Sequence, residues 1–176
     1  MSRTYCATGI NLKAIPLGES DRLLTILTAE MGLIRAIAPG ARKHKSRLGG
    51  RSGLFVINQL LLAQGKQLDK ITQAETVQSF PGLSKELSKL TAGQYLAELA
   101  LFQALDKHPQ EELYSLLVEH LTRVEAADST AVLPCLIQGL YHLLALGGIA
   151  PDVRSCCITR DPVLPDLSHT DWRVVV

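Results

Sequence analysis

Hydrophobic and polar residues follow two different patterns along the chain, and the change falls near Phe80. From Tyr5 to Val77, short segments rich in β-branched residues are separated by turn-forming residues, which is typical of strands. The pattern predicts strands at about 4–15, 22–29, 32–39, 54–63 and 68–78. Five strands in so short a stretch favour a small closed barrel.

Turn residues between the predicted strands indicate how the strands connect. We expect one hairpin at 30–32 and another at 64–67. The charged stretch 18–22 is interpreted as the turn between the first two strands, with Ser20 and Asp21 accepting hydrogen bonds from nearby backbone N–H groups. Alternation in the fifth strand places four residues on one face: Ile71, Gln73, Glu75 and Val77.

After Pro81 and Gly82 the apolar residues recur at helical spacing. Helices are predicted at about 91–107, 110–126 and 131–146, and Gly147 with Gly148 ends the last one. Each apolar stripe is expected to face the other helices. The three stripes are Tyr95, Leu99, Phe102 and Leu105; Leu113, Leu117, Leu121 and Val124; and Leu133, Ile137, Leu140 and Leu144.

The sequence therefore predicts an α+β protein with a barrel domain at 1–79, a helical domain at 80–150 and a C-terminal segment at 151–176. At 176 residues and 47% hydrophobic composition, the chain has ample apolar material for a core. The segment from Trp172 reads as the start of a strand and ends at three valines. We expect the chain to be part of a longer protein.

Charge is segregated along the chain although the net charge is only +1. No acidic residue lies between Glu30 and Asp69, whereas the rest of the chain holds 11 basic and 17 acidic residues. Residues 40–51, here called the basic loop, have the sequence GARKHKSRLGGR. The interval contains seven candidate DNA-binding cations: Arg35, Arg42, Lys43, Lys45, Arg47, Arg51 and Lys66.

Cations on a flexible loop can follow a phosphate backbone without reading the bases, because released counterions supply the free energy. Phe55 is the one aromatic residue near the loop, so base stacking is expected to be minor. If five phosphates on a single strand were neutralised, log K would fall with log salt with a slope of about −3.5. The alternatives are a solvated loop, a loop that binds an acidic protein while the helices act as an adaptor, and an RNA-binding barrel.

The sequence contains no motif of an enzyme active site. Phosphate-binding loops, dinucleotide fingerprints, HExxH and GxSxG are all absent, so we expect no catalysis. His120 and His142 are interpreted as surface or core residues. The N-terminus lacks a signal peptide and no apolar run is long enough to span a bilayer, which predicts a soluble, intracellular protein.

Four cysteines are too dispersed for a disulfide framework. Cys6 and Cys135 lie among apolar residues and are expected to be buried thiols. Cys156 and Cys157 are candidate zinc ligands, with Asp166 and His169 nearby, but one adjacent pair does not provide the usual ligand spacing. No metal or other cofactor is therefore predicted, and zinc is kept as an alternative.

A series of short motifs, in order along the chain, resembles the bacterial RecO family. The likeness covers nearly the whole chain and is carried by TGI at 8–10, LGESDR at 17–22, EMGLIR at 30–35, the basic loop, AE at 74–75, FPGL at 80–83 and YLAEL at 95–99. The resemblance implies an N-terminal OB-fold barrel, a helical domain and a cytoplasmic, nucleoid-associated role in recombinational repair.

The resemblance also implies partners. Family members bind and anneal single- and double-stranded DNA, act with RecR, contact the acidic tail of single-strand-binding protein (SSB) and thereby help to load RecA. The matching DNA-binding positions are Arg35 and the five cations of the basic loop. Lys85 and Lys89 are suggested as cations beside an SSB-binding groove. Some members carry a four-cysteine zinc module, but the spacing after Cys156 and Cys157 departs from it.

Overall fold

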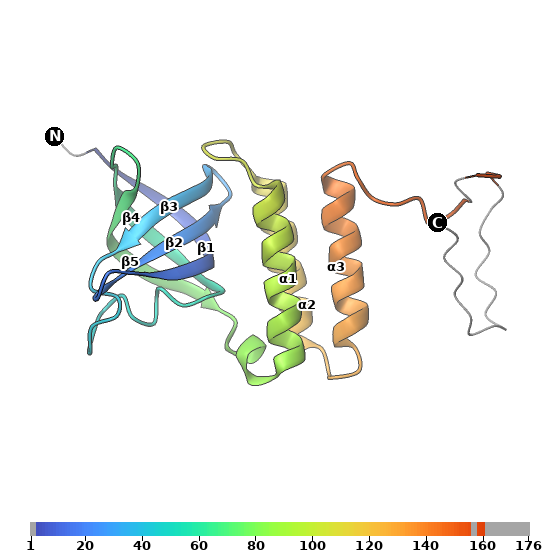
Figure 1. Ribbon diagram of the computed structural model, residues 1–176, viewed down its shortest axis with the longest axis horizontal. Coiled ribbons are helices and arrows are strands. Elements are labelled where there is room, and N and C mark those ends of the chain that lie inside the picture. The colour runs from blue at the N-terminus through green and yellow to red at the C-terminus, as the bar shows by residue number, and fades with distance from the viewer. Residues whose placement is uncertain (1–2, 156–157, 161–176) are drawn as a thin grey trace.

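The computed structural model describes residues 3–155 and 158–160, and its N-terminal part is a closed five-stranded barrel (Figure 1). All five predicted strands are present, and their ends lie within two residues of the predicted ones. The strands are β1 (Thr4–Leu17), β2 (Asp21–Thr28), β3 (Gly32–Ala38), β4 (Val56–Ala63) and β5 (Asp69–Ser79). They are arranged in the order β1, β2, β3, β5, β4, which agrees with the expected OB-fold barrel.

The long strand β1 closes the barrel because it pairs with both β2 and β4. Its pairing with β2 shifts between Asn11 and Lys13, a bulge that bends the strand between its two partners. On the opposite side, β3 and β5 are parallel and pair only at Ala36 with Asp69 and Ile37 with Lys70. Only these two residue pairs close the barrel on this side. The start of β3 lies beyond them, near the β4–β5 hairpin.

The predicted alternation along β5 is wrong beyond its first residues. Ile71 and Ala74 are buried, whereas Gln73 is exposed. The register against β4 shifts so that Leu61 pairs with Gln73 and Leu62 with Ile71. This bulge inserts one residue and changes which side of the strand faces inward. Sequence periodicity could not reveal the shift because the bulge depends on the partner strand.

The C-terminal part contains a short 3-10 helix, η1 (Pro81–Lys85), which was not predicted, followed by the three predicted α-helices, of which the first begins and ends four residues earlier than expected. They are α1 (Leu87–Gln103), α2 (Glu111–Ala126) and α3 (Val132–Leu146). In Figure 1, α1 and α2 lie next to the barrel and α3 lies on their far side. Within the described ranges, no helix combines the length and apolarity that crossing a bilayer requires.

The helices do not all bury the faces predicted for them. The prediction holds for α2, whose four predicted leucine and valine positions are buried. In α1, however, Tyr95 and Phe102 are exposed, and the buried face consists of Lys89, Ala92, Gly93, Leu96, Ala97 and Ala100. In α3, Leu133 and Ile137 are exposed, whereas Val132, Gly139 and Leu143 are buried.

Close packing of small residues explains the difference. A side chain at Gly93 would meet Phe55, Leu83 and Leu121 at 3.3 to 3.5 Å. At Gly139 it would meet Leu96 and His120 at 2.9 and 3.1 Å. A larger residue would collide with its neighbours at these two positions, so the contact faces combine glycine and alanine with Leu96 and Leu143, and Tyr95, Phe102, Leu133 and Ile137 lie outside.

One apolar cluster joins the barrel to the helices. Ile10, Leu12, Leu27 and Ile57 of the barrel pack in it with core residues of η1 and all three α-helices. A second cluster, which includes Leu24, Ile26, Leu60 and Ile71, fills the barrel interior. Because burial of apolar area is the main stabilising term, the shared cluster fixes the helices to one side of the barrel.

The loop between α1 and α2 is fastened to the β2–β3 hairpin. The N–H of Leu33 donates to the carbonyl of Leu105 at 3.0 Å, and the N–H of Gln110 donates to the carbonyl of Ala29 at 2.7 Å. Gly32 makes this approach feasible, since a Cβ there would lie 2.3 Å from the carbonyl oxygens of both Leu105 and His108. Its φ of +63° also favours glycine.

Gly32→Ala is therefore expected to lower the free energy of unfolding by about 3 kcal/mol or more, because it combines left-handed strain with a backbone clash. The matched control is Gly18→Ala. Gly18 has a φ of +60° with no atom within 4 Å of the added methyl group, so only about 1 kcal/mol is expected. Urea denaturation of the two variants measures the difference. Equal losses would contradict the importance of this contact.

Candidate nucleic-acid interface

The basic loop is a succession of hydrogen-bonded turns, not the flexible coil expected from the sequence. The N–H of Lys43 donates to Gly40 O at 3.0 Å, that of Ser46 to Lys43 O at 3.1 Å, and that of Gly49 to Ser46 O at 3.3 Å. Lys45 has a left-handed φ of +63°, which helps the chain to turn back. The cations are therefore held at defined positions.

Asp21 fastens the start of the loop. Its Oδ1 accepts the N–H of Gly40 at 2.7 Å and the hydroxyl of Ser20 at 2.8 Å, and Ser20 O accepts the N–H of Arg42 at 2.9 Å. The turn predicted at 18–22 is present but shorter, at 18–20, because β2 begins at Asp21; in addition, Asp21 accepts a distant N–H group and the Ser20 hydroxyl is a donor. The Gly40 N–H, then Ser20, and more weakly Lys43 and Lys70, hold the pKa of Asp21 below its ordinary value.

Two buried asparagines fasten the end of the loop. Asn11 donates from Nδ2 to Arg51 O at 2.8 Å and to Gly53 O at 2.9 Å, and Asn58 donates to Arg51 O at 2.9 Å. Both asparagines are almost completely inaccessible to solvent. A buried amide is stable only with partners, and these bonds satisfy the Nδ2 groups of both asparagines, whereas Asn11 Oδ1 has no hydrogen-bond partner among the described residues. Arg22 supports the same segment through a bond of 2.9 Å to the Ser52 hydroxyl.

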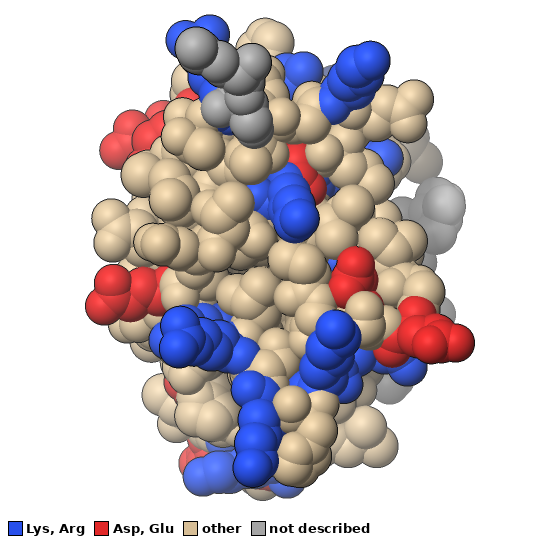
Figure 2. Space-filling view, turned by 90° about the vertical axis from the view of Figure 1, so that its left-hand side faces the viewer, with Lys and Arg blue, Asp and Glu red and all other residues tan. Residues whose placement is uncertain are grey.

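Arg42, Lys43, Lys45 and Arg47 are all exposed. None of them forms an ion pair with a carboxylate within residues 3–155 and 158–160. Figure 2 shows Lys and Arg side chains gathered in the lower part of the barrel face, at the height of the basic loop in Figure 1. Arg51 is half-buried. It lines with Arg47 a cleft of about 530 Å³ beside β4 and β5.

The seven predicted cations do not form one site. Arg35 lies on β3 and lines a separate pocket with Gln64 and Gln67, which flank the exposed Lys66 in the β4–β5 hairpin. In Figure 1 this hairpin is at the top of the barrel and the basic loop is at the bottom. Lys70, missed by the sequence reasoning, acts on Asp21 together with Lys43. The search for cations covered only the interval without acidic residues, and this interval ends at Asp69, directly before Lys70.

Phe55 does not provide a surface for base stacking. It is 3% exposed, adopts a φ of +57° and approaches α1 at Gly93. Its N–H donates to Asn11 O at 2.9 Å, directly after the basic loop. Phe55 thus ties the loop to the helices, and the small stacking contribution expected from the sequence is smaller still.

Of the two lysines suggested for protein contacts, only Lys85 is exposed. Lys89 is 8% exposed, pairs with Glu86 at 3.2 Å and donates to Glu125 O at 3.1 Å. Through these two contacts the Lys89 ammonium group links the segment between η1 and α1 to the end of α2. The structure therefore does not place Lys89 on a free surface.

The cysteines and histidines that were considered for chemistry or metal binding differ in burial or in contacts from what the sequence suggested. Cys6 is exposed in the cleft beside Arg47, and Cys135 is half-buried, so the prediction of buried thiols is wrong. His120 is buried and its Nε2 lies 3.1 Å from His142 Nδ1, a pairing that the sequence did not suggest. Burial is the main cause of the lowered pKa of His120.

The candidate zinc ligands Cys156 and Cys157, together with Asp166 and His169, lie outside the described residues. Elsewhere in the described portion, no group of three His, Cys, Asp or Glu side chains is placed to hold a metal ion. The zinc alternative is therefore not addressed by this geometry.

Comparison with known proteins gives one consistent result. Residues 1–80 match the family described as recombination protein O N terminal, and residues 84–174 match recombination protein O C terminal. DNA repair protein RecO of Nostoc sp. is 59% identical over 177 residues, covering 99% of this chain and 60% of that protein. The RecO protein of Acaryochloris marina is 60% identical over 174 residues, covering 99% and 59%. The chain thus spans about 60% of the length of these curated relatives.

The Asp21 contact predicts an acid-dependent loss of stability. Because the folded pKa lies below the ordinary value of 3.8, the contact stabilises the fold above that pH, and the stabilisation is lost as pH falls through the folded pKa. In Asp21→Asn this part of the pH dependence should be absent. Urea midpoints between about pH 3 and pH 7 test this, and parallel curves for both proteins would contradict it.

Proposed function

Because the chain belongs to the RecO family of DNA repair proteins, we propose that it is a non-enzymatic mediator of recombinational repair. It binds single- and double-stranded DNA through the barrel and makes or breaks no covalent bond. The observation that carries the proposal is the basic loop, an ordered segment whose exposed cations have no ion pair among the described residues.

The chemistry of the loop suits phosphate better than a protein ligand. The guanidinium groups of Arg42 and Arg47 offer planar pairs of donors for phosphate oxygens, and Lys43 and Lys45 add more mobile point charges. Hydrogen-bonded turns within the loop lower the entropy cost of holding its cations in place for binding. Contacts of this kind favour DNA in general over a particular sequence.

Annealing follows from the same electrostatics. Two complementary strands repel each other through their phosphates, and a surface that neutralises phosphates on both strands lowers this repulsion. The protein then only brings strands together, and base pairing provides the free energy. This role requires a cluster of cations and no catalytic group.

The helical part is proposed to serve protein partners. Exposed apolar residues on α1 and α3, including Tyr95, Phe102 and Ile137, are candidates to contact the acidic, apolar tail of SSB, and Lys85 is an exposed cation on the helical part. Contacts with SSB and RecR would allow the protein to help RecA displace SSB from single-stranded DNA. Because the chain spans about 60% of its relatives, these partners belong to the proposal for the whole protein.

DNA binding is tested with a variant carrying Arg42→Ala, Lys43→Ala, Lys45→Asn and Arg47→Ala. Asn is chosen at position 45 because it tolerates the left-handed backbone. Loss of four phosphate contacts should weaken binding of a labelled single strand and make the log–log salt slope shallower by about 2.8. Fluorescence anisotropy at several salt concentrations measures both quantities.

The matched control carries Lys13→Ala, Lys85→Ala, Arg154→Ala and Arg160→Asn. It removes the same charge from exposed positions outside the basic loop and places Asn at a similar φ of +65°. The control should retain most of the affinity and the salt slope. If both variants bind alike, or if the intact chain does not bind DNA, the proposal is wrong.

Annealing provides a second test. The intact chain should accelerate pairing of two complementary labelled strands at low salt, and the four-residue loop variant should lose most of this acceleration because it cannot neutralise both strands. Energy transfer between the labels reports the rate. Acceleration that persists in the loop variant would place annealing on another surface.

A further inference from the structure

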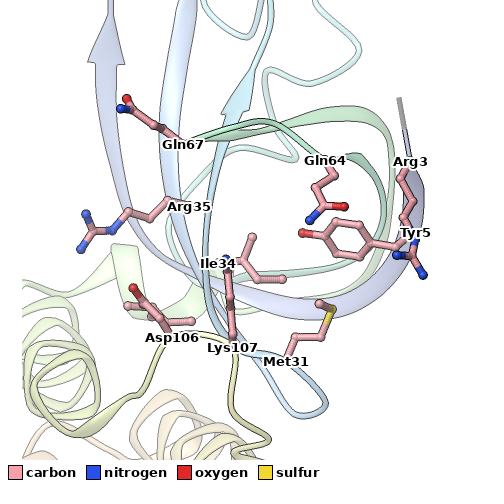
Figure 3. Close-up of a pocket in the computed structure, with 10 residues that line it drawn as sticks. Arg3, Tyr5, Met31, Ile34, Arg35, Gln64, Gln67, Asp106 and Lys107 are labelled. Carbon is pink, nitrogen blue, oxygen red and sulfur yellow. The ribbon is translucent and has the colours of Figure 1, made fainter. Parts of the chain in front are cut away.

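A pocket of about 480 Å³ lies where the barrel meets the loop between α1 and α2, away from the basic loop (Figure 3). Its size falls within the usual range for small-molecule sites, roughly 300 to 1,000 Å³. Four separate segments form it: the start of β1, the start of β3, the β4–β5 hairpin and the α1–α2 loop. The lining residues are Arg3, Tyr5, Met31, Leu33, Ile34, Arg35, Gln64, Gln67, Asp106 and Lys107.

Backbone hydrogen bonds hold the walls of this pocket in place. The N–H of Gln64 donates to Arg3 O at 2.9 Å, which joins the hairpin to β1. The N–H of Gly65 donates to the Asp69 carboxylate at 3.0 Å, which closes the hairpin turn. On the other side, the bond from Leu33 to Leu105 fastens the α1–α2 loop to β3. The four segments that form the cavity are therefore connected in pairs by hydrogen bonds.

The ring of Tyr5 is oriented by a second contact of Asp69. Its hydroxyl donates to the carboxylate of Asp69, and burial with this neighbouring charge raises the pKa of Tyr5. Tyr5 therefore remains a neutral phenol, with a ring face that can stack on a flat ligand. In Figure 3, Gln64 and Met31 lie on either side of this ring.

The rest of the lining combines three kinds of chemistry. Met31 and Ile34 are apolar, and Gln64 and Gln67 offer amide donors and acceptors. Arg3, Arg35 and Lys107 bring positive charge, against one lining carboxylate at Asp106. Within residues 3–155 and 158–160 none of these three cations forms an ion pair. A flat ring, hydrogen-bonding groups and cations together match a nucleotide.

We propose that this pocket binds one unstacked nucleotide of a single DNA strand. The base lies against Tyr5 and Met31, and the amides of Gln64 and Gln67 bind its edge. Arg35 and Lys107 hold the flanking phosphates. Because bases in a duplex are stacked and paired, the pocket favours single strands, whereas the basic loop binds phosphates of either form.

This inference rests on the proposed function and deepens it, because the basic loop contains no Phe, Tyr or Trp and binds DNA chiefly through the phosphates. The pocket also gives Arg35 a role that its separation from the basic loop would otherwise leave unexplained. Binding should therefore contain a part that depends on the bases and a part that depends only on the phosphates.

The test compares a short oligothymidylate with an abasic strand that has the same number of phosphates. The intact chain should bind the strand with bases roughly tenfold tighter, a typical contribution of one stacked base. A pocket variant carrying Gln64→Ala, Gln67→Ala and Lys107→Asn, all at exposed positions, should lose this preference. Its salt slope should change by about 0.7 or less, because the basic loop is intact.

A photochemical cross-link gives an independent measurement in the intact chain. A strand containing 5-iododeoxyuridine should cross-link to Tyr5 or Met31, identified by mass spectrometry of the protein fragments. Cross-links confined to the basic loop would overturn the proposal.

The outcomes separate this inference from the proposed function. If both strands bind equally, with a steep salt slope, the pocket proposal fails and phosphate binding stands. If neither strand binds, the proposed function fails as well. If the pocket substitutions weaken binding of an Asp- and Glu-rich peptide and leave the preference for bases intact, the pocket serves a protein partner and the nucleotide proposal is wrong.

Discussion

Hydrogen bonds from barrel side chains to the backbone of the basic loop are the interaction on which the rest of the structure depends. The cations of this loop repel one another, and its apolar residues, Ala41 and Leu48, pack against the barrel cluster and are too few to form a core of their own. Asp21 holds the beginning of the loop, and Asn11 and Asn58 hold its end. These three side chains come from the barrel, so folding of the barrel imposes the arrangement of the charges.

The same anchoring connects the two parts of the molecule. Asn11 accepts the N–H of Phe55, and Phe55 enters the apolar cluster that the barrel shares with the helices. Gly93 on α1 leaves room for that ring. A segment proposed to bind DNA is thus continuous with the core that positions the helices. The loop proposed to bind DNA and the helices proposed to bind protein partners are thus joined through one shared apolar cluster.

The sequence was a good guide to which residues carry positive charge and a poor guide to their positions. The interval without acidic residues identified the cations of the basic loop, because the charge of a side chain can be read from the residue type alone, without knowledge of its tertiary contacts. Arg35 and Lys66 belong to the same interval but lie at the other end of the barrel. Lys70 was missed because Asp69 precedes it. The pocket at the α1–α2 loop left no sequence pattern, since its lining comes from four segments.

Local patterns alone determined the five strands, the three helices, the turn at 18–20 and the segregation of charge, because each depends on neighbouring residues. The buried faces of α1 and α3 were decided by tertiary structure. Gly93 and Gly139 lie at contacts where a larger side chain would collide with its neighbours, and Tyr95, Phe102 and Ile137 face outward. The bulge in β5, the binding of Asp21 to Gly40 and the burial of Phe55 likewise depend on distant partners. Packing and hydrogen bonding between remote segments are absent from any local window of the sequence, and they decide which side chains are buried and which are free to bind.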